Sequence, residues 1–538
     1  MSFEKIIKKG FGVITAILCV MLIMIYSYLF ILNLIGTTTI DITRNAYTEF
    51  AEYNIAKPIA TILCFCGMSM LAYFIYSSET LEKMDPDKIK RAAFWIVLVL
   101  GIFWVMVTRG TPIADQLIVS MSASDFINGK FDMMELGEYL SRFPHQFGIV
   151  FIFELIYRIF GTSNYQAIMI INAFCGAGIF LNIYSILKEL TDNKKVLNGY
   201  AVFSALYFVL PFYSFFVYGT LIGLYFATLS LRFITKIYKM NEVISVKKVL
   251  YYIVALLALG VAVISKSNYS IFVIALVLCF AFASVKEKKY VNVIFALLLV
   301  FSFTATSFVC NHYEKVSGKE VYKGAPKSLY VAMGLQEGNL DQGCGSNGWY
   351  NAYNVIVLGE TGYDFDKADE VAKENIKDRI EDFKKHPGKI LPFFNSKVAT
   401  QWCEPSQQVF WMVSVNDNHG ELSKFGKNLL TGKVRKNLTN YFRQLLLLIL
   451  AGNIFFYIRS FKRKDFFIFV FGIYVIGGFL FHAVWEAKAL YILPYLVISV
   501  PCGIIGINYF FEYIRCKMNN GMKAEKQKNQ KTDKAKKK

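Results

Sequence analysis

The sequence predicts an all-α polytopic membrane protein with about twelve transmembrane helices, juxtamembrane helices in the first exterior loop and a mixed exterior domain. Of its 538 residues, 55% are hydrophobic and only 18% are charged, which is more apolar and less charged than a typical soluble domain. Apolar stretches of about 17 to 25 residues recur along the chain, and each is long enough to cross a bilayer.

Twelve such stretches are expected to form transmembrane helices, near residues 10–35, 57–77, 91–108, 165–187, 197–213, 219–237, 249–264, 269–285, 290–309, 441–458, 466–482 and 489–513. The first is too long for the core of a signal peptide and lacks a small-residue cleavage site. It is therefore interpreted as a membrane anchor.

The spans divide the chain into five parts. We expect two extra N-terminal transmembrane helices, a transmembrane core with its first exterior loop, an exterior domain, a C-terminal set of helices and a basic disordered cytoplasmic tail, at 1–90, 91–309 (loop 109–164), 310–440, 441–513 and 514–538. Gly/Asn-rich turns and an amphipathic helix near 366–386 mark the exterior domain.

The basic residues predict the orientation of these helices. Lysines and arginines precede the first span, lie in alternate connections after it and fill the tail, and such a bias marks the cytoplasmic side of a cell-membrane protein. Both termini are then cytoplasmic, provided that residues 145–160 do not cross the membrane. That segment is short and is interrupted by Glu154 and Arg158, so we expect an interfacial or re-entrant helix.

The net charge of +19 does not indicate a nucleic-acid partner. The basic residues occupy short connections and the tail, and no folded basic domain is expected to carry them. Their predicted partners are anionic headgroups of the membrane lipids.

The first candidate for chemistry is Asp115, which lies just past a predicted span in the first exterior loop. A carboxylate at the membrane surface, close to lipid substrates, can accept a proton from an attacking hydroxyl. It can also hold a divalent metal that neutralises a phosphate. The residues leave both roles open, beside the simpler reading of a solvated surface Asp.

Two further groups suit an anionic headgroup. Arg142, His145 and Gln146 precede the segment that we expect to lie along the membrane, and Arg binds phosphate bidentately. Lys266 and Asn268 lie where two spans meet on the predicted exterior side, against the charge bias. Headgroup snorkelling is the alternative for the first group and a structural ion pair for the second.

The densest polar cluster lies at a late span boundary. His482, Glu486, Lys488 and Tyr491 are expected to line one exterior pocket, since ionisable residues at membrane depth are functional candidates. The alternative is an interfacial aromatic belt. In the exterior domain, Trp402 is a candidate for stacking on a sugar ring, or it is an interface anchor.

Several enzyme classes are excluded by the absence of their motifs. The chain has no Walker loop, no HExxH, no GxSxG and no CxxC pair, so ATPase, zincin and serine-hydrolase activities are not expected. A disulfide between Cys344 and Cys403, both in the predicted exterior domain, is left open.

Taken together, the order of motifs resembles the bacterial polytopic GT-C glycosyltransferases, relatives of the protein mannosyltransferases (glycosyltransferase family 39-like) and the lipid A aminoarabinose transferases. The resemblance covers roughly residues 91–510. It rests on an early loop Asp, a YxxxFP-type turn, a helix ending in Phe160-Gly161, a late WEAKxxYxLPY segment and an exterior GL…NGWYN segment, here Gly334-Leu335 and Asn347–Asn351.

The resemblance implies a GT-C-like fold and a sugar donor linked to polyprenyl phosphate, with inverting transfer on the outer face. Asp115 matches the family's catalytic first-loop carboxylate. Lys266, Glu486 and Lys488 are implied to face the donor phosphate or sugar, and Tyr491 lies where relatives often carry a polar aromatic. The chain departs from the family where Leu490 replaces a common Arg and where Phe-Pro-His-Gln replaces a polar-Pro-Pro turn.

The acceptor is expected to be an envelope glycan, lipid or protein, and the sequence names neither it nor the sugar. The residues identify no cofactor with certainty, and a divalent metal held by Asp115 is left open. Two alternatives remain from the residues: a lipid-linked glycan transporter or flippase, which would show repeats and mid-membrane polar sites, and a non-catalytic membrane protein of envelope assembly.

Overall fold

The computed structural model describes residues 3–41, 49–108, 110–338, 346–414, 424–430, 432–461, 463 and 465–536. Ten helical segments in this part of the chain are long and apolar enough to span a membrane, which confirms the predicted all-α membrane fold. They are α1 (Phe3–Ile35), α2 (Pro58–Ser77), α4 (Pro86–Thr108), α8 (Tyr165–Leu190), α11 (Thr220–Lys239), α12 (Val246–Ser265), α13 (Ser270–Lys286), the continuous pair α14 (Tyr290–Leu298) and α15 (Thr304–Ser317), α22 (Gly432–Ser460) and α24 (Leu493–Lys536).

The remaining helices are shorter and lie in the bundle, in the connections and in the exterior domain. They are α3 (Thr80–Lys83), α5 (Asp115–Ile127), α6 (Tyr139–Arg142), α7 (Phe147–Phe160), α9 (Lys194–Leu206), α10 (Val209–Phe212), α16 (Lys327–Gly334), α17 (Tyr353–Glu360), α18 (Phe365–Lys385), α19 (Ile390–Trp402), α20 (Val409–Ser414), α21 (Lys424–Leu430) and α23 (Phe469–Val484).

All twelve predicted spans fall on helices. The predicted span at 197–213 is a pair of helical pieces, α9 and Val209–Phe215, that meet at an angle of 44°. The predicted span at 466–482 is α23, which is shorter than the ten long helices. In the packed bundle α22 contacts both α1 and α24, and α11 contacts both α8 and α12.

The segment after the first exterior helix turns sharply. The helical pieces Asp132–Arg142 and Pro144–Phe160 meet at 104°, and Pro144 stands at the break because proline cannot continue a helix that precedes it. Helix α7 has 14 residues, fewer than the roughly 20 that a straight crossing needs. It packs against α5, α12 and α15. Its position along the membrane, and not across it, remains a prediction.

The basic connections gather at one end of the bundle. Lys195, in the first turn of α9, pairs with Glu82 of α3 at 3.2 Å, and Arg515 of α24 pairs with Glu79 at 3.0 Å. Lys289, between α13 and α14, donates to a backbone carbonyl at the end of α11 at 2.7 Å. Connections that are distant in sequence thus share one face, as the charge bias predicts.

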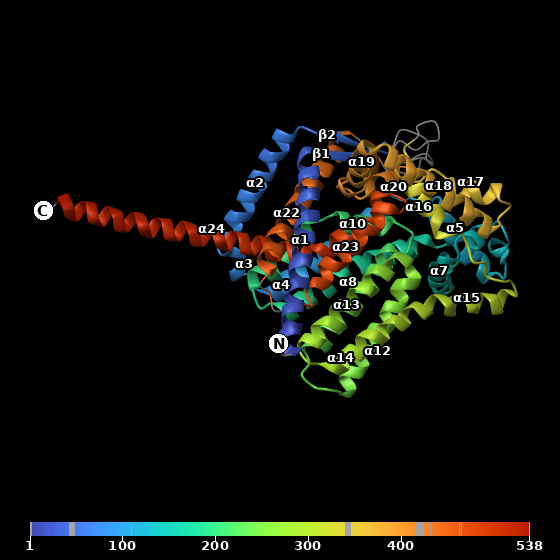
Figure 1. Ribbon diagram of the computed structural model, residues 1–538, viewed down its shortest axis with the longest axis horizontal. Coiled ribbons are helices and arrows are strands. Elements are labelled where there is room, and N and C mark those ends of the chain that lie inside the picture. Colours follow the sequence, from blue (N-terminus) through green and yellow to red (C-terminus); the bar gives the residue numbers. More distant parts are fainter. Residues whose placement is uncertain are drawn as a thin grey trace.

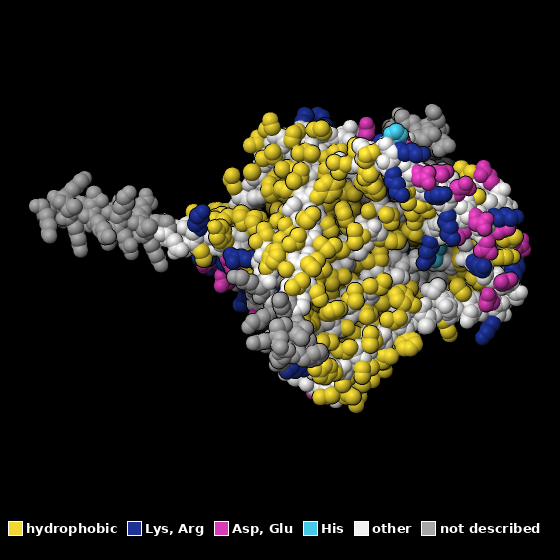
Figure 2. All heavy atoms as spheres, viewed as in Figure 1, with side chains coloured by type: hydrophobic (Ala, Val, Ile, Leu, Met, Phe, Trp, Pro, Cys, Tyr) yellow, Lys and Arg dark blue, Asp and Glu magenta, His cyan; other side chains and the backbone are white. Residues whose placement is uncertain are grey.

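An apolar belt surrounds the bundle between its two charged ends. Figure 2 shows hydrophobic side chains covering the middle of the molecule, with charged side chains concentrated beyond the belt. Large apolar residues of α2 point outward, including Leu63, Met70 and Phe74, because lipid and not water is their expected surrounding.

The described part of the exterior domain is helical, which differs from the mixed structure expected there. The strands β1 (Gly36–Asp41) and β2 (Phe50–Ile55) instead form an antiparallel hairpin between α1 and α2, with Gly36 opposite Ile55. The hairpin packs on α19, where the Thr38 amide donates to the Cys403 carbonyl at 2.8 Å. Cys344 lies outside the described residues, so the disulfide with Cys403 remains untested.

At the C-terminus the structure differs from the expected disordered tail. Helix α24 continues to Lys536 and projects from the bundle (Figure 1). The tail is rich in Lys, Gln, Glu and Ala, which are good helix formers.

Candidate functional site

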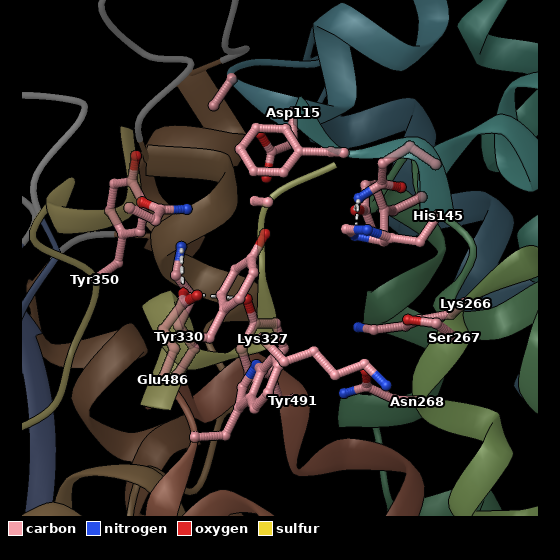
Figure 3. Close-up of a pocket in the computed structure, with 18 of the residues that line it drawn as sticks. Asp115, His145, Lys266, Ser267, Asn268, Lys327, Tyr330, Tyr350, Glu486 and Tyr491 are labelled. Carbon is pink, nitrogen blue, oxygen red and sulfur yellow. Dashed lines mark hydrogen bonds and ion pairs between the residues drawn. The ribbon is translucent and has the colours of Figure 1, made fainter. Parts of the chain in front are cut away.

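A cavity of about 880 Å³ opens at the end of the bundle opposite the basic connections. Three helices that begin near basic connections, α4, α12 and α23, end beside it. Segments from all along the chain reach it, including the residue before β2, the start of α5, the bend before α7, the α12–α13 junction, α16 and the segment after α23. Figure 3 shows the polar side chains converging from opposite walls.

Asp115 is the first residue of α5 and faces this cavity (Figure 3). The backbone places it there through a sharp turn, since Ala114 has a φ of 48°, a conformation that an L-residue rarely adopts. The next residue, Gln116, is buried and accepts a hydrogen bond from the Val217 amide at 2.9 Å. This bond ties the start of α5 to the loop before α11.

One wall of the cavity carries Glu486, Lys488 and Tyr491. The Lys488 ammonium lies 3.9 Å from Glu486, and the Tyr491 hydroxyl donates to Glu486 at 3.2 Å. Burial raises the pKa of Glu486 to about 7; Lys488 opposes the shift, and Asp115 adds to it. Burial alone would lower the pKa of Lys488, but the neighbouring carboxylates raise this pKa above its usual value.

The facing wall carries Lys266 and Asn268 at the α12–α13 junction (Figure 3). The Lys266 ammonium lies 3.3 Å from the Thr220 hydroxyl and 4.9 Å from the centre of the Tyr491 ring. Burial, with a contribution from Lys488, lowers the pKa of Lys266 to about 7. Among the described residues no carboxylate lies at hydrogen-bonding distance from this ammonium, and a desolvated cation of this kind is suited to bind an anion.

His145 and Gln146 complete the rim of that wall. The Gln146 side chain donates to the Tyr218 hydroxyl, and its Nε2 atom lies 3.3 Å from His145 Nε2. Of the three predicted residues in this turn, only these two line the cavity. Arg142 lies outside it and stacks over the Phe143 ring at 5.5 Å, because the 104° bend at Pro144 directs the two sides of the turn apart.

Two other predicted residues lie behind the cavity. His482 is fully buried and stacks on the inner side of Tyr491 at 5.7 Å between ring centres. Trp402 is also buried and packs against Phe479 and Tyr495, so its ring faces the protein core and is not open to a sugar. Both belong to helices whose apolar packing turns these side chains inward.

Aromatic residues missed at the sequence level provide the flat surface instead. Tyr330 and Trp485 stack at 4.8 Å between ring centres, and both line the cavity together with Tyr350. Tyr350 belongs to the NGWYN segment, so the motif itself was a signal. No sequence signal marked Tyr330, because only folding brings α16 against the end of α23.

Charged residues were missed as well. Lys323 and Lys327 line the cavity. They come from the irregular strap 318–326 and the first residue of α16, and within this strap Gly324 has a φ of 78° and lies against Pro144. Glu49, the residue before β2, also lines the cavity and lies 3.3 Å from Lys488. Nothing in the local sequence distinguishes Glu49 from other loop carboxylates.

A buried lysine holds the aromatic wall in place. Lys397 of α19 is fully buried and donates to the carbonyls of Gly334 and, at 2.7 Å, Trp485. Above it, the Gly348 carbonyl accepts from the Ala487 amide at 2.8 Å. The NGWYN segment and the WEAK segment are therefore joined beneath the cavity.

Within the described ranges, no three side chains of His, Cys, Asp or Glu are placed to hold a metal ion together. Asp115 as a metal ligand would need donors from the substrate or solvent.

Comparison with known proteins agrees with the predicted resemblance. Residues 144–310 match the family of dolichyl-phosphate-mannose-protein mannosyltransferases. This segment includes His145, Gln146, Lys266 and Asn268. The match confirms the GT-C resemblance over this segment and supports a glycosyltransferase. No curated protein matches the chain.

Among solved structures, the chain is similar to those of the Archaeoglobus fulgidus oligosaccharyltransferase. The enzyme AglB in complex with an inhibitory peptide and a dolichol-phosphate is 13% identical, with a TM-score of 0.42, over 80% of this chain and 52% of that one. Its apo form is 14% identical, with a TM-score of 0.46, over 82% and 53%. A complex with Zn and sulfate is 15% identical, with a TM-score of 0.42, over 78% and 49%. The chain thus spans about half the length of these proteins.

Proposed function

We propose that this protein moves a sugar from a polyprenyl-phosphate donor to a cell-envelope acceptor at the exterior face of the membrane, with inversion at the sugar carbon. The observation that carries the proposal is one cavity in which the Asp115 carboxylate lies across from desolvated cationic and polar groups, Lys266 and Asn268. With the basic connections taken as cytoplasmic, this cavity faces the exterior and both termini lie inside.

In this mechanism the acceptor hydroxyl lies against Asp115. As the oxygen of the hydroxyl forms its bond to C1 of the sugar, its proton passes to the Asp115 carboxylate. The bond between C1 and the phosphate oxygen breaks on the opposite face, and polyprenyl phosphate leaves with the bonding electrons. No strong general acid is needed, because the leaving phosphate carries the charge itself.

The positive wall stabilises that leaving group. Lys266 and the side-chain amide of Asn268 would face the phosphate as the bond breaks, when its negative charge increases. The stacked rings of Tyr330 and Trp485 would support the sugar, since the C–H face of a pyranose packs well on an aromatic surface. The strap that carries Lys323 and precedes Lys327 would cover the site and exclude water.

The test is Asp115→Asn, which keeps the size of the side chain and removes its basicity. Transfer from a polyprenyl-phosphate-linked sugar is expected to fall by about two to four orders of magnitude, with the amount of folded protein unchanged. Asp125→Asn is the matched control, because Asp125 lies near the other end of α5 and does not line the cavity. Full transfer by Asp115→Asn would refute the role.

A further inference from the structure

The N-terminal hairpin brings a third carboxylate into the cavity. Glu49 precedes β2, and the hairpin is fixed from several sides. The Tyr53 hydroxyl donates to the Leu32 carbonyl at 2.8 Å, and the Thr38 hydroxyl donates to the Ala399 carbonyl at 2.8 Å. Glu49 is therefore held at the cavity by the segment that joins the two N-terminal helices.

The contacts of Glu49 satisfy only one of its two oxygens. Its Oε1 atom lies 3.3 Å from the Lys488 ammonium, and that ammonium is shared with Glu486 at 3.9 Å. The Glu49 side chain is 9% exposed, and its Oε2 atom is buried without a hydrogen-bond partner in the described part of the chain. A buried carboxylate oxygen that lacks a donor is costly, which indicates that a donor is supplied by a bound molecule.

The charge of this wall limits which molecule fits. Glu49 and Glu486 share one ammonium, and Asp115 also faces the cavity. With the donor phosphate against Lys266, the sugar ring extends toward this acidic wall. Hydroxyl and amino groups can donate to it, whereas a second carboxylate would meet like charges in a poorly solvated space.

We propose that Glu49 is a specificity-determining residue that selects uncharged or amino sugars and rejects acidic sugars. The proposal rests on the proposed function, because it requires the sugar of the donor to occupy this cavity. It assigns the two N-terminal helices a role in substrate choice through the hairpin that joins them. A purely structural Glu49–Lys488 pair would leave sugar preference unchanged when Glu49 is altered.

The experiment measures binding of four probes to the full chain in detergent: polyprenyl phosphate and its glucose, glucosamine and glucuronic acid conjugates. The variants are Glu49→Gln, which removes the charge, and Glu49→Asp, which keeps the charge but moves the carboxylate oxygens back from the cavity by one methylene. Glu52→Gln is the control, since Glu52 lies on the adjoining strand β2 but is exposed. Thermal unfolding of each variant reports whether the fold is retained.

The wild type is expected to bind the glucose and glucosamine conjugates at least tenfold more tightly than the glucuronic acid conjugate. Glu49→Gln should reduce this ratio of affinities by about tenfold. Glu49→Asp should still reject the acidic sugar, and Glu52→Gln should leave the ratio unchanged. The inference is overturned if the wild type binds all three conjugates equally, or if Glu49→Gln keeps the wild-type ratio. In either case, binding of polyprenyl phosphate and loss of transfer in Asp115→Asn would leave the proposed function standing.

Discussion

Replacing Gly348 with alanine tests whether the junction beneath the cavity positions the acidic wall. Gly348 has a φ of 70°, and a Cβ atom there would lie 2.4 Å from the Gly334 carbonyl oxygen and 2.8 Å from Lys397 Cε. The carbonyl cannot yield without moving α16. The lysine cannot yield without breaking its hydrogen bonds to Gly334 and Trp485.

The expected cost follows from these two effects. A left-handed backbone costs an alanine about 1–2 kcal/mol, and an extra carbon in a packed site costs about 1–3 kcal/mol. The free energy of unfolding should therefore fall by about 2–5 kcal/mol. Because the Ala487 amide donates to the Gly348 carbonyl, Glu486 and Lys488 should also be displaced, and a displacement of about 1 Å can reduce catalysis a hundredfold.

Two nearby glycines separate the cost of the left-handed backbone from the cost of the steric contact. Gly362 has a φ of 61° but open space where a Cβ would lie, and Gly359, in α17, has open space and an ordinary helical backbone. Gly362→Ala should lose about 1–2 kcal/mol, and Gly359→Ala should be neutral or slightly stabilising. Denaturant unfolding in detergent and sugar transfer are measured for all three variants. If Gly348→Ala unfolds like Gly359→Ala and keeps its activity, the junction does not position the site.

Two further predictions concern the cationic wall and the topology. Burial and Lys488 lower the pKa of Lys266 to about 7, and Glu486 opposes this shift, so raising the pH from 6.5 to 8.5 removes the ammonium and should raise the KM for the donor by about tenfold. Lys266→Arg keeps its charge over this range, and an equal rise of KM in that variant would assign the titration to another group. A reporter fused after Asn193 should read as cytoplasmic, because the adjoining Lys195 lies at the basic end of the bundle; an exterior signal would mean that residues 145–160 cross the membrane.

Much of the fold could be predicted from the sequence because spanning a bilayer requires long apolar helices. Each predicted span falls on a helix, and the basic connections share one end of the bundle. The two spans that are bent or short, at 197–213 and 466–482, still carry enough apolar residues to be recognised. The angle between the two pieces of the 197–213 span is set by packing against neighbours, and the sequence does not report it.

The candidate site was predicted in part for the same reason. Ionisable residues at the ends of apolar helices stand out, and eight of the eleven predicted positions line one cavity: Asp115, His145, Gln146, Lys266, Asn268, Glu486, Lys488 and Tyr491. The other three, Arg142, His482 and Trp402, share the same local signals. The bend at Pro144 and the packing of α19 and α23 turn them away from the cavity.

The sequence by itself determined that the protein is a helical membrane protein with charged groups concentrated at helix ends, because the apolar core of a bilayer dictates where such groups can lie. Only the tertiary structure decided which of those groups meet. Glu49, Tyr330 and Lys397 come from segments that are far apart in the chain, and their convergence depends on the packing of the hairpin on α19 and of α16 against α23. The sequence indicated Asp115, and the folded chain placed it across from a desolvated lysine.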